Sequence, residues 1–347
     1  MRVLVTGHNG YIGCSLVPLL QEARHEVVGL DNYLYESCTF GEDVADPPAF
    51  RKDVRDVEVS DLEGFEAVIH LAAISNDPVG DLAPDTTYEI NHRAASRLAK
   101  LAKRAGVERF LFSSSCSLYG AAGDDYLDES AAFNPVTPYG ESKILAEDDM
   151  RALADDDFSP TYLRNATAYG LSPRLRGDLV VNNLTAYAFT TGQVLIKSDG
   201  TPWRPLVHIE DISRAFVAIL DAPRELIHDQ AFNVGRTEEN YQIRDVGSIV
   251  EDIVPGSTVT YAEGASPDIR NYRVDCDKLA RTLPAFQPQW TVRKSVEELY
   301  AAFVAHELEY DDFLSRRFMR IKHVREMQAE GGLDERLRRP TLEATGV

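Results

Sequence analysis

Short apolar runs alternate with amphipathic stretches through the first half of the chain. The apolar runs lie at 2–7, 25–31, 65–73, 107–115 and 159–167. Stretches with the spacing of one-sided helices follow several of them, at 11–23, 85–106 and 138–154. Because strands alternate with helices, we predict right-handed crossovers and a doubly wound parallel sheet. Most of these segments contain a continuous apolar run, as expected when helices cover both faces of a sheet.

This alternation loosens after about residue 165. A helix is predicted at 179–192 and a buried strand at 230–235, with loops, a short strand and another helix between them. Residues 311–347 are rich in charged side chains, and we expect a final helix there followed by a poorly ordered tail. The pattern therefore predicts an α/β protein with a first sheet domain, a smaller C-terminal lobe and a charged extension.

Length and charge narrow the classes of function. The chain has 347 residues, enough for a sizeable core and two lobes. Its 36 Lys and Arg residues face 56 Asp and Glu residues, and a formal net charge of −20 would repel nucleic acid and anionic membranes. The sequence shows neither a signal peptide nor an apolar run of about 20 residues. We expect a cytoplasmic protein with no nucleic-acid or membrane partner.

The cysteine pattern argues against a metal site. The four cysteines are far apart and show no ligand spacing with each other or with histidine. Free thiols in a reducing compartment are therefore expected at Cys14, Cys38, Cys116 and Cys276.

Three glycines follow the first strand with the spacing of a dinucleotide-binding turn. Gly7, Gly10 and Gly13 would allow a tight turn, close approach of a pyrophosphate, and close packing of the next helix, whose N-terminus attracts phosphate. Asp31 ends the second strand, where a carboxylate accepts hydrogen bonds from the adenosine ribose and repels a 2′-phosphate. This combination predicts NAD as the cofactor. Asp53 could contact the adenine or lie in a solvated loop.

The segment "SSSCSLYG" (113–120) and the helix that follows it supply candidate catalytic groups. Tyr139 and Lys143 are four residues apart and share one helix face. An ammonium group favours the phenolate form of a nearby tyrosine, which can then act as a base. Such a pair is common on protein surfaces, but Ser115 lies at the C-terminal end of a parallel strand, where ligands bind in open sheets. Its hydroxyl could hydrogen-bond the oxygen that Tyr139 deprotonates.

Together these segments resemble the extended short-chain dehydrogenase/reductase family. The resemblance is carried by "TGHNGYIG", Asp31, "HLAAIS", "SSSCSLYG" and "YGESK", and extends from residue 1 to about 305. Within the family, the chain is similar to the NAD-dependent nucleotide-sugar epimerases and dehydratases. The resemblance implies a Rossmann-type NAD-binding domain formed by residues 1–165 and 204–235. It also implies a smaller nucleotide-sugar-binding lobe formed by residues 166–203 and 236–310. Residues 311–347 lie outside the common pattern.

The resemblance also implies roles for individual residues. Ser115, Tyr139 and Lys143 match the family's Ser/Thr–Tyr–Lys triad. The implied cofactor-binding residues are Gly7, Gly10, Tyr11, Ile12, Gly13, Asp31, Asn32, Asp53, Val54, Leu71, Ala72, Ala73, Ser113, Tyr139 and Lys143. The implied substrate-binding residues are Ser75, Ser115, Thr167, Asn183, Arg204 and Arg270.

The implied partner is a nucleotide-diphosphate sugar, since arginine forks suit a diphosphate. Ser75 could instead cap its own loop. A homodimer is also implied, formed through the helices near 84–104 and 137–154.

The chain departs from the family pattern at positions that bear on the reaction. Thr167 stands where the epimerases usually carry Asn, and Pro205 where Asp is usual, so we expect a different sugar pocket. The family's dehydratases carry Asp and Glu directly after the catalytic Ser/Thr, where this chain has Cys116 and Ser117. This disfavours 4,6-dehydration, and we expect Cys116 to be a buried packing residue.

We therefore predict an NAD-dependent nucleotide-sugar epimerase that acts at C4 through a transient 4-keto intermediate. The alternative is a 4-ketoreductase or dehydrogenase acting on a nucleotide-linked sugar, which would consume NAD(P)H stoichiometrically. The identities of the nucleotide and the sugar stay open.

Overall fold

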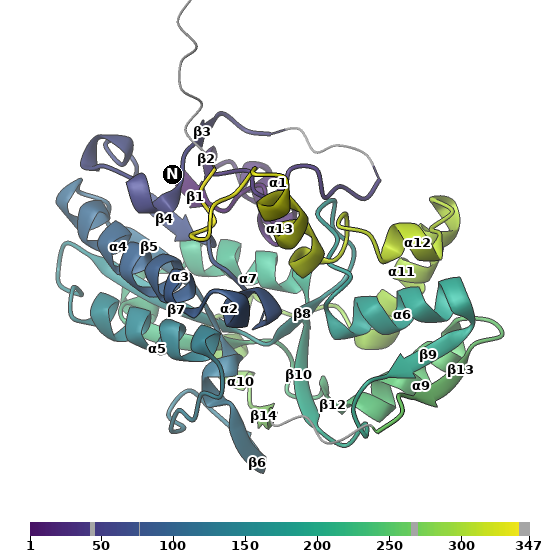
Figure 1. Cartoon of the computed structure of the whole chain (residues 1–347). Helices are drawn as coiled ribbons and strands as arrows, with labels where there is room; N and C mark the ends of the chain where they lie inside the picture. The colour runs from purple at the N-terminus through teal and green to yellow at the C-terminus, as the bar shows by residue number, and fades with distance from the viewer. Residues whose placement is uncertain (42–45, 76, 265–269, 340–347) are drawn as a thin grey trace, which may run out of the picture.

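A seven-stranded parallel sheet forms the centre of the molecule (Figure 1). The computed structural model describes residues 1–41, 46–75, 77–264 and 270–339. The strands lie in the order β11 (Gln230–Val234), β7 (Ser159–Asn165), β5 (Arg109–Ser115), β4 (Ala67–His70), β1 (Arg2–Thr6), β2 (Glu26–Asp31) and β3 (Ala49–Arg51). The predicted doubly wound parallel sheet is confirmed. Of these seven strands, β3 alone was not predicted, because its three residues are exposed and carry no apolar run.

Helices cover both faces of this sheet. On one face, α1 (Gly13–Glu22) and α7 (Ile209–Asp221) pack together and share an apolar core with the strands. On the other face, α4 (Ala95–Arg104) and α5 (Pro138–Arg151) bury a second apolar cluster. Because both faces are covered, β4 and β7 are buried along their whole length. The apolar run of β4 reflects this burial, whereas β7 also buries polar side chains that have partners, such as Arg164 with Glu147.

The helix predicted at 85–106 is interrupted by a wider turn. It consists of α3 (Pro84–Tyr88), a π-helical stretch η3 (Glu89–Ala94) and α4. Within η3, the Asn91 side chain accepts a hydrogen bond from the Ile74 amide at 2.8 Å and donates one to the Ile74 carbonyl at 2.9 Å. The π turn therefore aims an amide at the loop after β4. Such turns are frequent next to functional sites.

A smaller α/β lobe stands beside the sheet domain and has its own apolar core. One of its sheets has three strands, in the order β12 (Asn240–Gln242), β10 (Trp203–His208) and β8 (Thr167–Tyr169). Two further strand pairs are β13 (Thr258–Tyr261) with β9 (Gln193–Ile196), and β14 (Asn271–Val274) with β6 (Ala121–Leu127). The longer helices of the lobe are α6 (Val180–Thr191), α9 (Ile243–Ile253) and α11 (Val292–Ala305).

Short elements connect these parts. They are α2 (Asp77–Leu82), α8 (Arg224–Ile227), α10 (Asp277–Thr282), η1 (Val54–Asp56), η2 (Val59–Asp61) and η4 (Cys116–Tyr119). The resemblance assigns residues 204–235 to the first domain. Within this segment, β11 is part of the main sheet and α7 packs on it, whereas β10 pairs with β8 and β12 of the smaller lobe. No helix in the described ranges is long and apolar enough to cross a bilayer.

The C-terminal extension is folded as far as the structure describes it. It contains α12 (Tyr310–Phe313) and α13 (Arg320–Ala329), drawn in yellow-green and yellow in Figure 1. The poorly ordered tail expected after the final helix is wrong for residues 330–339. These residues fold back on the sheet domain, because Arg338 pairs with Asp56 at 2.7 Å. Residues 340–347 lie outside the described ranges.

Candidate active site

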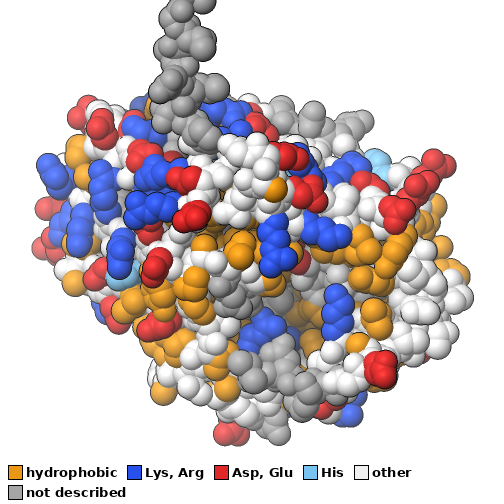
Figure 2. Space-filling model, viewed as in Figure 1, with side chains coloured by type: hydrophobic (Ala, Val, Ile, Leu, Met, Phe, Trp, Pro, Cys, Tyr) orange, Lys and Arg blue, Asp and Glu red, His pale blue; other side chains and the backbone are white. Residues whose placement is uncertain are grey.

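A cleft of about 980 Å³ is lined by both lobes. Figure 2 shows a hollow in the middle of this face, with Lys and Arg side chains around it. The structure brings all the site residues predicted from the sequence to this cleft: Gly7, Gly10, Tyr11, Ile12, Gly13, Asp31, Asn32, Asp53, Val54, Leu71, Ala72, Ala73, Ser75, Ser113, Ser115, Tyr139, Lys143, Thr167, Asn183, Arg204 and Arg270.

The turn between β1 and α1 has no room for side chains. Gly7 has a φ of +75°, and a Cβ on it would lie 2.8 Å from the backbone nitrogen of Ala72. A Cβ on Gly13 would lie 2.3 Å from the His8 carbonyl oxygen. Bare backbone therefore faces the cleft at the start of α1, where amide groups and the helix dipole attract anions. This cradle fits the pyrophosphate of a dinucleotide.

Two carboxylates border the same part of the cleft. Asp31 accepts hydrogen bonds from the backbone nitrogens of Tyr33 at 2.7 Å and Asn9 at 3.2 Å, and burial raises its pKa. Asp53 forms an ion pair with Arg55 at 2.6 Å. Burial alone would raise the pKa of Asp53, but its hydrogen bonds with Arg55 outweigh burial and lower it. Asp53 is thus a fixed, paired group with a side chain that is 14% exposed, not a solvated loop acid.

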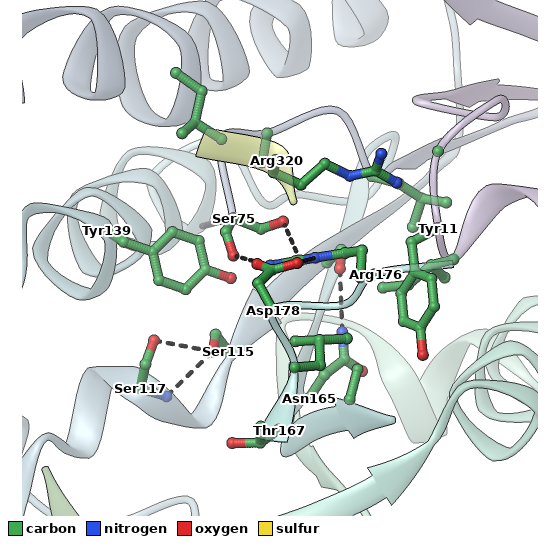
Figure 3. Close-up of a pocket in the computed structure, with 18 of the residues that line it drawn as sticks. Tyr11, Ser75, Ser115, Ser117, Tyr139, Asn165, Thr167, Arg176, Asp178 and Arg320 are labelled. Atoms are coloured by element: carbon green, nitrogen blue, oxygen red, sulfur yellow. Dashed lines mark hydrogen bonds and ion pairs between the residues drawn. The ribbon is translucent and has the colours of Figure 1, made fainter. Parts of the chain in front are cut away.

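The candidate catalytic groups meet where β5 ends and α5 begins. Ser115 accepts a hydrogen bond from the Ser117 amide at 3.1 Å, and the two hydroxyl oxygens lie 2.9 Å apart. Lys143 Nζ donates to the Ser113 carbonyl at 2.7 Å and lies 5.8 Å from the centre of the Tyr139 ring. Figure 3 shows the Tyr139 hydroxyl and the Ser115 side chain facing one space. A substrate hydroxyl in that space could meet both.

Lys143 is buried, and a second ion pair supports the helix that carries it. Burial lowers the pKa of Lys143 to about 7, against a smaller opposing effect of Glu147. Tyr139, Lys143 and Glu147 follow one another at helical spacing on α5. Glu147 pairs with Arg164 of β7 at 2.7 Å and accepts a hydrogen bond from the Ser114 hydroxyl of β5 at 2.5 Å. These contacts fix α5, and with it Tyr139, against two strands.

The two positions after Ser115 carry no carboxylate and differ in exposure. Cys116 is fully buried, and its thiol donates to the Arg164 carbonyl at 3.0 Å. Burial raises the pKa of Cys116 well above its usual range. The expectation that Cys116 is a buried packing residue is confirmed. Ser117 lines the cleft instead.

The far end of the cleft belongs to the smaller lobe. Arg204 on β10 is 7% exposed and donates to the carbonyls of Trp203, at 2.8 Å, and Arg270. Asn183 on α6 donates to a backbone carbonyl at 2.6 Å, and Thr167 lies at the start of β8. The end of the cleft opposite the glycine turn therefore carries two guanidinium groups and an amide, which suit a second diphosphate.

Sequence reasoning missed polar groups in the middle of the cleft. Arg176 pairs with Asp178 at 2.6 Å and donates to the Ser75 hydroxyl at 3.1 Å, a cluster visible in Figure 3. Asn165 donates to the Ser113 hydroxyl at 3.1 Å. The only signal was the Arg-x-Asp sequence in a segment interpreted as a loop. The C-terminal extension also contributes lining residues that the sequence did not indicate: Met319, Arg320 and Leu337.

Sequence comparison identifies relatives over most of the chain. A sequence model of the "NAD dependent epimerase/dehydratase family" matches residues 3–235. The UDP-glucose 4-epimerase of Bacillus subtilis (strain 168) is 28% identical over 329 residues, which cover 87% of this chain and 95% of that protein. The UDP-glucose 4-epimerase of Mus musculus is 28% identical over 303 residues, covering 76% of this chain and 86% of that protein.

Solved structures agree with these relatives. MoeE5 in complex with UDP-glucuronic acid and NAD is 27% identical, with a TM-score of 0.77 over 89% of this chain and 100% of that one. The UDP-glucuronic acid 4-epimerase of Bacillus cereus, in complex with UDP-glucuronic acid and NAD, is 25% identical, with a TM-score of 0.75 over 88% and 99%. The predicted family and the predicted cofactor, NAD, are confirmed. The chain therefore belongs to the NAD dependent epimerase/dehydratase family, the NAD-dependent nucleotide-sugar enzymes among the extended short-chain dehydrogenase/reductases.

Proposed function

We propose that this protein epimerises a nucleotide-diphosphate sugar at C4 through a transient 4-keto intermediate. One observation carries the proposal: Ser115, Tyr139 and Lys143 meet in the cleft, while the next two positions offer a buried thiol and a hydroxyl. The first three groups suit oxidation and reduction of a secondary alcohol. Elimination of water would need an additional acid and base, which Cys116 and Ser117 do not supply.

The chain's own groups would move the proton. Bound NAD would supply the hydride acceptor and donor. The Tyr139 phenolate takes the proton of the C4 hydroxyl and returns it when the alcohol forms again. The Ser115 hydroxyl donates a hydrogen bond to the same oxygen, and the Lys143 ammonium stabilises the phenolate. Because Lys143 is fixed by the Ser113 carbonyl, its charge stays close to the Tyr139 ring.

Inversion at C4 requires that the keto sugar present both faces to the cofactor. Arg204, Arg270 and Asn183 would hold the diphosphate while the sugar turns, since guanidinium forks bind phosphate oxygens in pairs.

A 4-ketoreductase or dehydrogenase acting on a nucleotide-linked sugar is the second candidate, because it would use the same three groups. A panel of UDP-, dTDP-, GDP- and CDP-sugars, followed by nuclear magnetic resonance, separates the candidates. We expect a 4-epimer that keeps a deuterium placed at C4, with no net formation of NADH. A deuterium moved to C6, stoichiometric use of cofactor, or no 4-epimer across the panel would each contradict the proposal.

Tyrosine variants complete this test. Tyr139→Phe removes the proposed base and should lower turnover by about 10²–10⁴-fold. Tyr126→Phe changes a tyrosine that is 49% exposed and outside the cleft lining, and should leave turnover unchanged. Equal activity of both variants would exclude Tyr139 as the base.

We also infer a homodimer formed through α4 and α5. On α5, Leu145 is 37% exposed, as expected for a residue that packs against a second copy. Light scattering should give twice the chain mass, and Leu145→Glu should shift it toward the monomer. A monomeric wild-type protein would contradict this arrangement.

A further inference from the structure

The C-terminal extension reaches the dinucleotide end of the cleft. Met319, Arg320 and Leu337 line the same cleft as the glycine turn and Asp31. All three lie beyond residues 3–235, which the family model matches, and beyond the part of the sequence that resembles the family. The extension therefore adds a wall that the family pattern does not predict.

Apolar packing and ion pairs fix this wall to the sheet domain. Val324, Leu333 and Leu337 form a buried cluster with Ile74 and Val79, which follow β4. The charged contacts go to the loops that follow Asp31 and Asp53: Arg338 to Asp56 at 2.7 Å, Arg339 to Glu36 at 3.1 Å and to the Tyr33 carbonyl at 2.7 Å. The extension is thus tied to three segments from which cofactor contacts are expected.

Arg320 is the buried cation of this wall. It is 3% exposed, and its guanidinium lies 4.3 Å from the centre of the Tyr35 ring. Its Nη2 donates to the Arg174 carbonyl at 2.8 Å, whereas its Nη1 is shielded and has no hydrogen-bond partner among the described residues. Within the same residues, no carboxylate forms an ion pair with it. A buried guanidinium without a counter-ion is costly, so Arg320 is suited to bind an anion.

The neighbours of Arg320 indicate which anion it would bind. Arg174, whose carbonyl accepts from Arg320, donates through its own guanidinium to the Asn9 carbonyl and side chain in the glycine turn, at 3.2 and 2.9 Å. Figure 3 shows the Arg320 guanidinium pointing toward the segment that carries Tyr11. Arg320 therefore lies beside the backbone cradle for a pyrophosphate, whereas Arg204 and Arg270 come from the smaller lobe.

We propose that Arg320 supplies, from the C-terminal extension, a positive charge to the diphosphate of the bound dinucleotide. The guanidinium would donate to a phosphate oxygen that the glycine turn contacts from the other side. The inference rests on the proposed position of NAD in the cleft, and it is independent of the reaction that follows.

Nucleotide binding to the cofactor-free protein tests this role. For Arg320→Gln, we expect the Kd of NAD and of ADP-ribose to rise at least about tenfold, as for loss of a charge-assisted hydrogen bond. Adenosine, which lacks phosphate, and UDP, which carries the diphosphate of a nucleotide sugar, should bind as they do to the wild type. Arg325→Gln, an exposed arginine on the same helix, is the matched control and should change none of these values.

Three results would overturn the proposal. If Arg320→Gln raised the Kd of adenosine as much as the Kd of NAD, Arg320 would only shape the binding site and would not contact a phosphate. Weaker binding of UDP with unchanged NAD would assign the charge to the sugar nucleotide. A melting temperature of the cofactor-free Arg320→Gln protein far below that of Arg325→Gln would show a structural role, because the mutation removes a hydrogen bond and a ring contact but also an unpaired buried charge. Formation of a 4-epimer is not among the readouts, so the test stands apart from the proposed reaction.

Discussion

The buried ion pair between Glu147 and Arg164 allows a quantitative prediction. Their side chains are 1% and 3% exposed, and the Ser114 hydroxyl also donates to Glu147. Glu147→Ala would leave a guanidinium in the interior without its carboxylate, a change that costs about 3–5 kcal/mol. The lost acceptor of Ser114 adds about 1 kcal/mol. The expected sum, about 4–6 kcal/mol, is a large fraction of a typical free energy of unfolding of about 5–15 kcal/mol.

Urea denaturation of the cofactor-free protein measures this cost without a contribution from bound ligand. Asp148→Ala, an exposed position on the same helix, is the control and should change the free energy of unfolding by no more than about 0.5 kcal/mol. Glu147→Leu combined with Arg164→Met removes both charges and should cost clearly less than Glu147→Ala alone. If Glu147→Ala costs no more than the control, the pair does not fix α5.

Three further perturbations follow from the cleft. Burial lowers the pKa of Lys143 from 10.5 to about 7 in the folded protein. Between these two pH values the unfolded chain therefore binds one more proton at Lys143 than the folded protein does. The stability of the cofactor-free protein should therefore rise with pH across this range, and Lys143→Met should remove that part of the slope in denaturation curves. If the Asp31 carboxylate binds the ribose, Asp31→Asn should raise the Kd of NAD about tenfold in calorimetry, and an unchanged Kd would contradict that role. Cys116→Ala should keep turnover, and native Cys116 should not react with a thiol reagent at pH 8, because burial raises its pKa; a labelled thiol would oppose its packing role.

The features that the sequence predicted depend on local patterns. The glycine turn is a contiguous segment between β1 and α1, and Asp31 ends the next strand. Ser115 ends β5 and Tyr139 begins the following helix, so the topology of a parallel sheet brings them together without any detailed packing. For the same reason, the alternation of strands and helices was enough to predict a doubly wound parallel sheet, although not the order of its strands.

The features that escaped prediction depend on contacts between distant segments. Arg176 and Asp178 resemble an ordinary charged loop until their packing against Ser75 places them in the cleft. The π turn at Asn91 requires the Ile74 backbone, which local sequence does not reveal. Charged residues of 330–339 were interpreted as a tail, because a charge run is usually solvated and its acidic partners lie far away in the sequence.

The covered dinucleotide end of the cleft bears on the class of reaction. A reductase that consumes NADH must release the spent cofactor in every turnover, so ties such as Arg338 to Asp56 would have to open each time. A C4 epimerase regenerates NAD within one turnover, so slow release of the cofactor does not lower its turnover rate. If Arg320 binds the dinucleotide as proposed, the dissociation rate of NAD should be lower than kcat in the wild type. Arg320→Gln should raise that dissociation rate while 4-epimer formation continues, because Arg320 is absent from the proton-transfer groups. Dissociation faster than turnover in the wild type would remove this argument for an internal redox cycle.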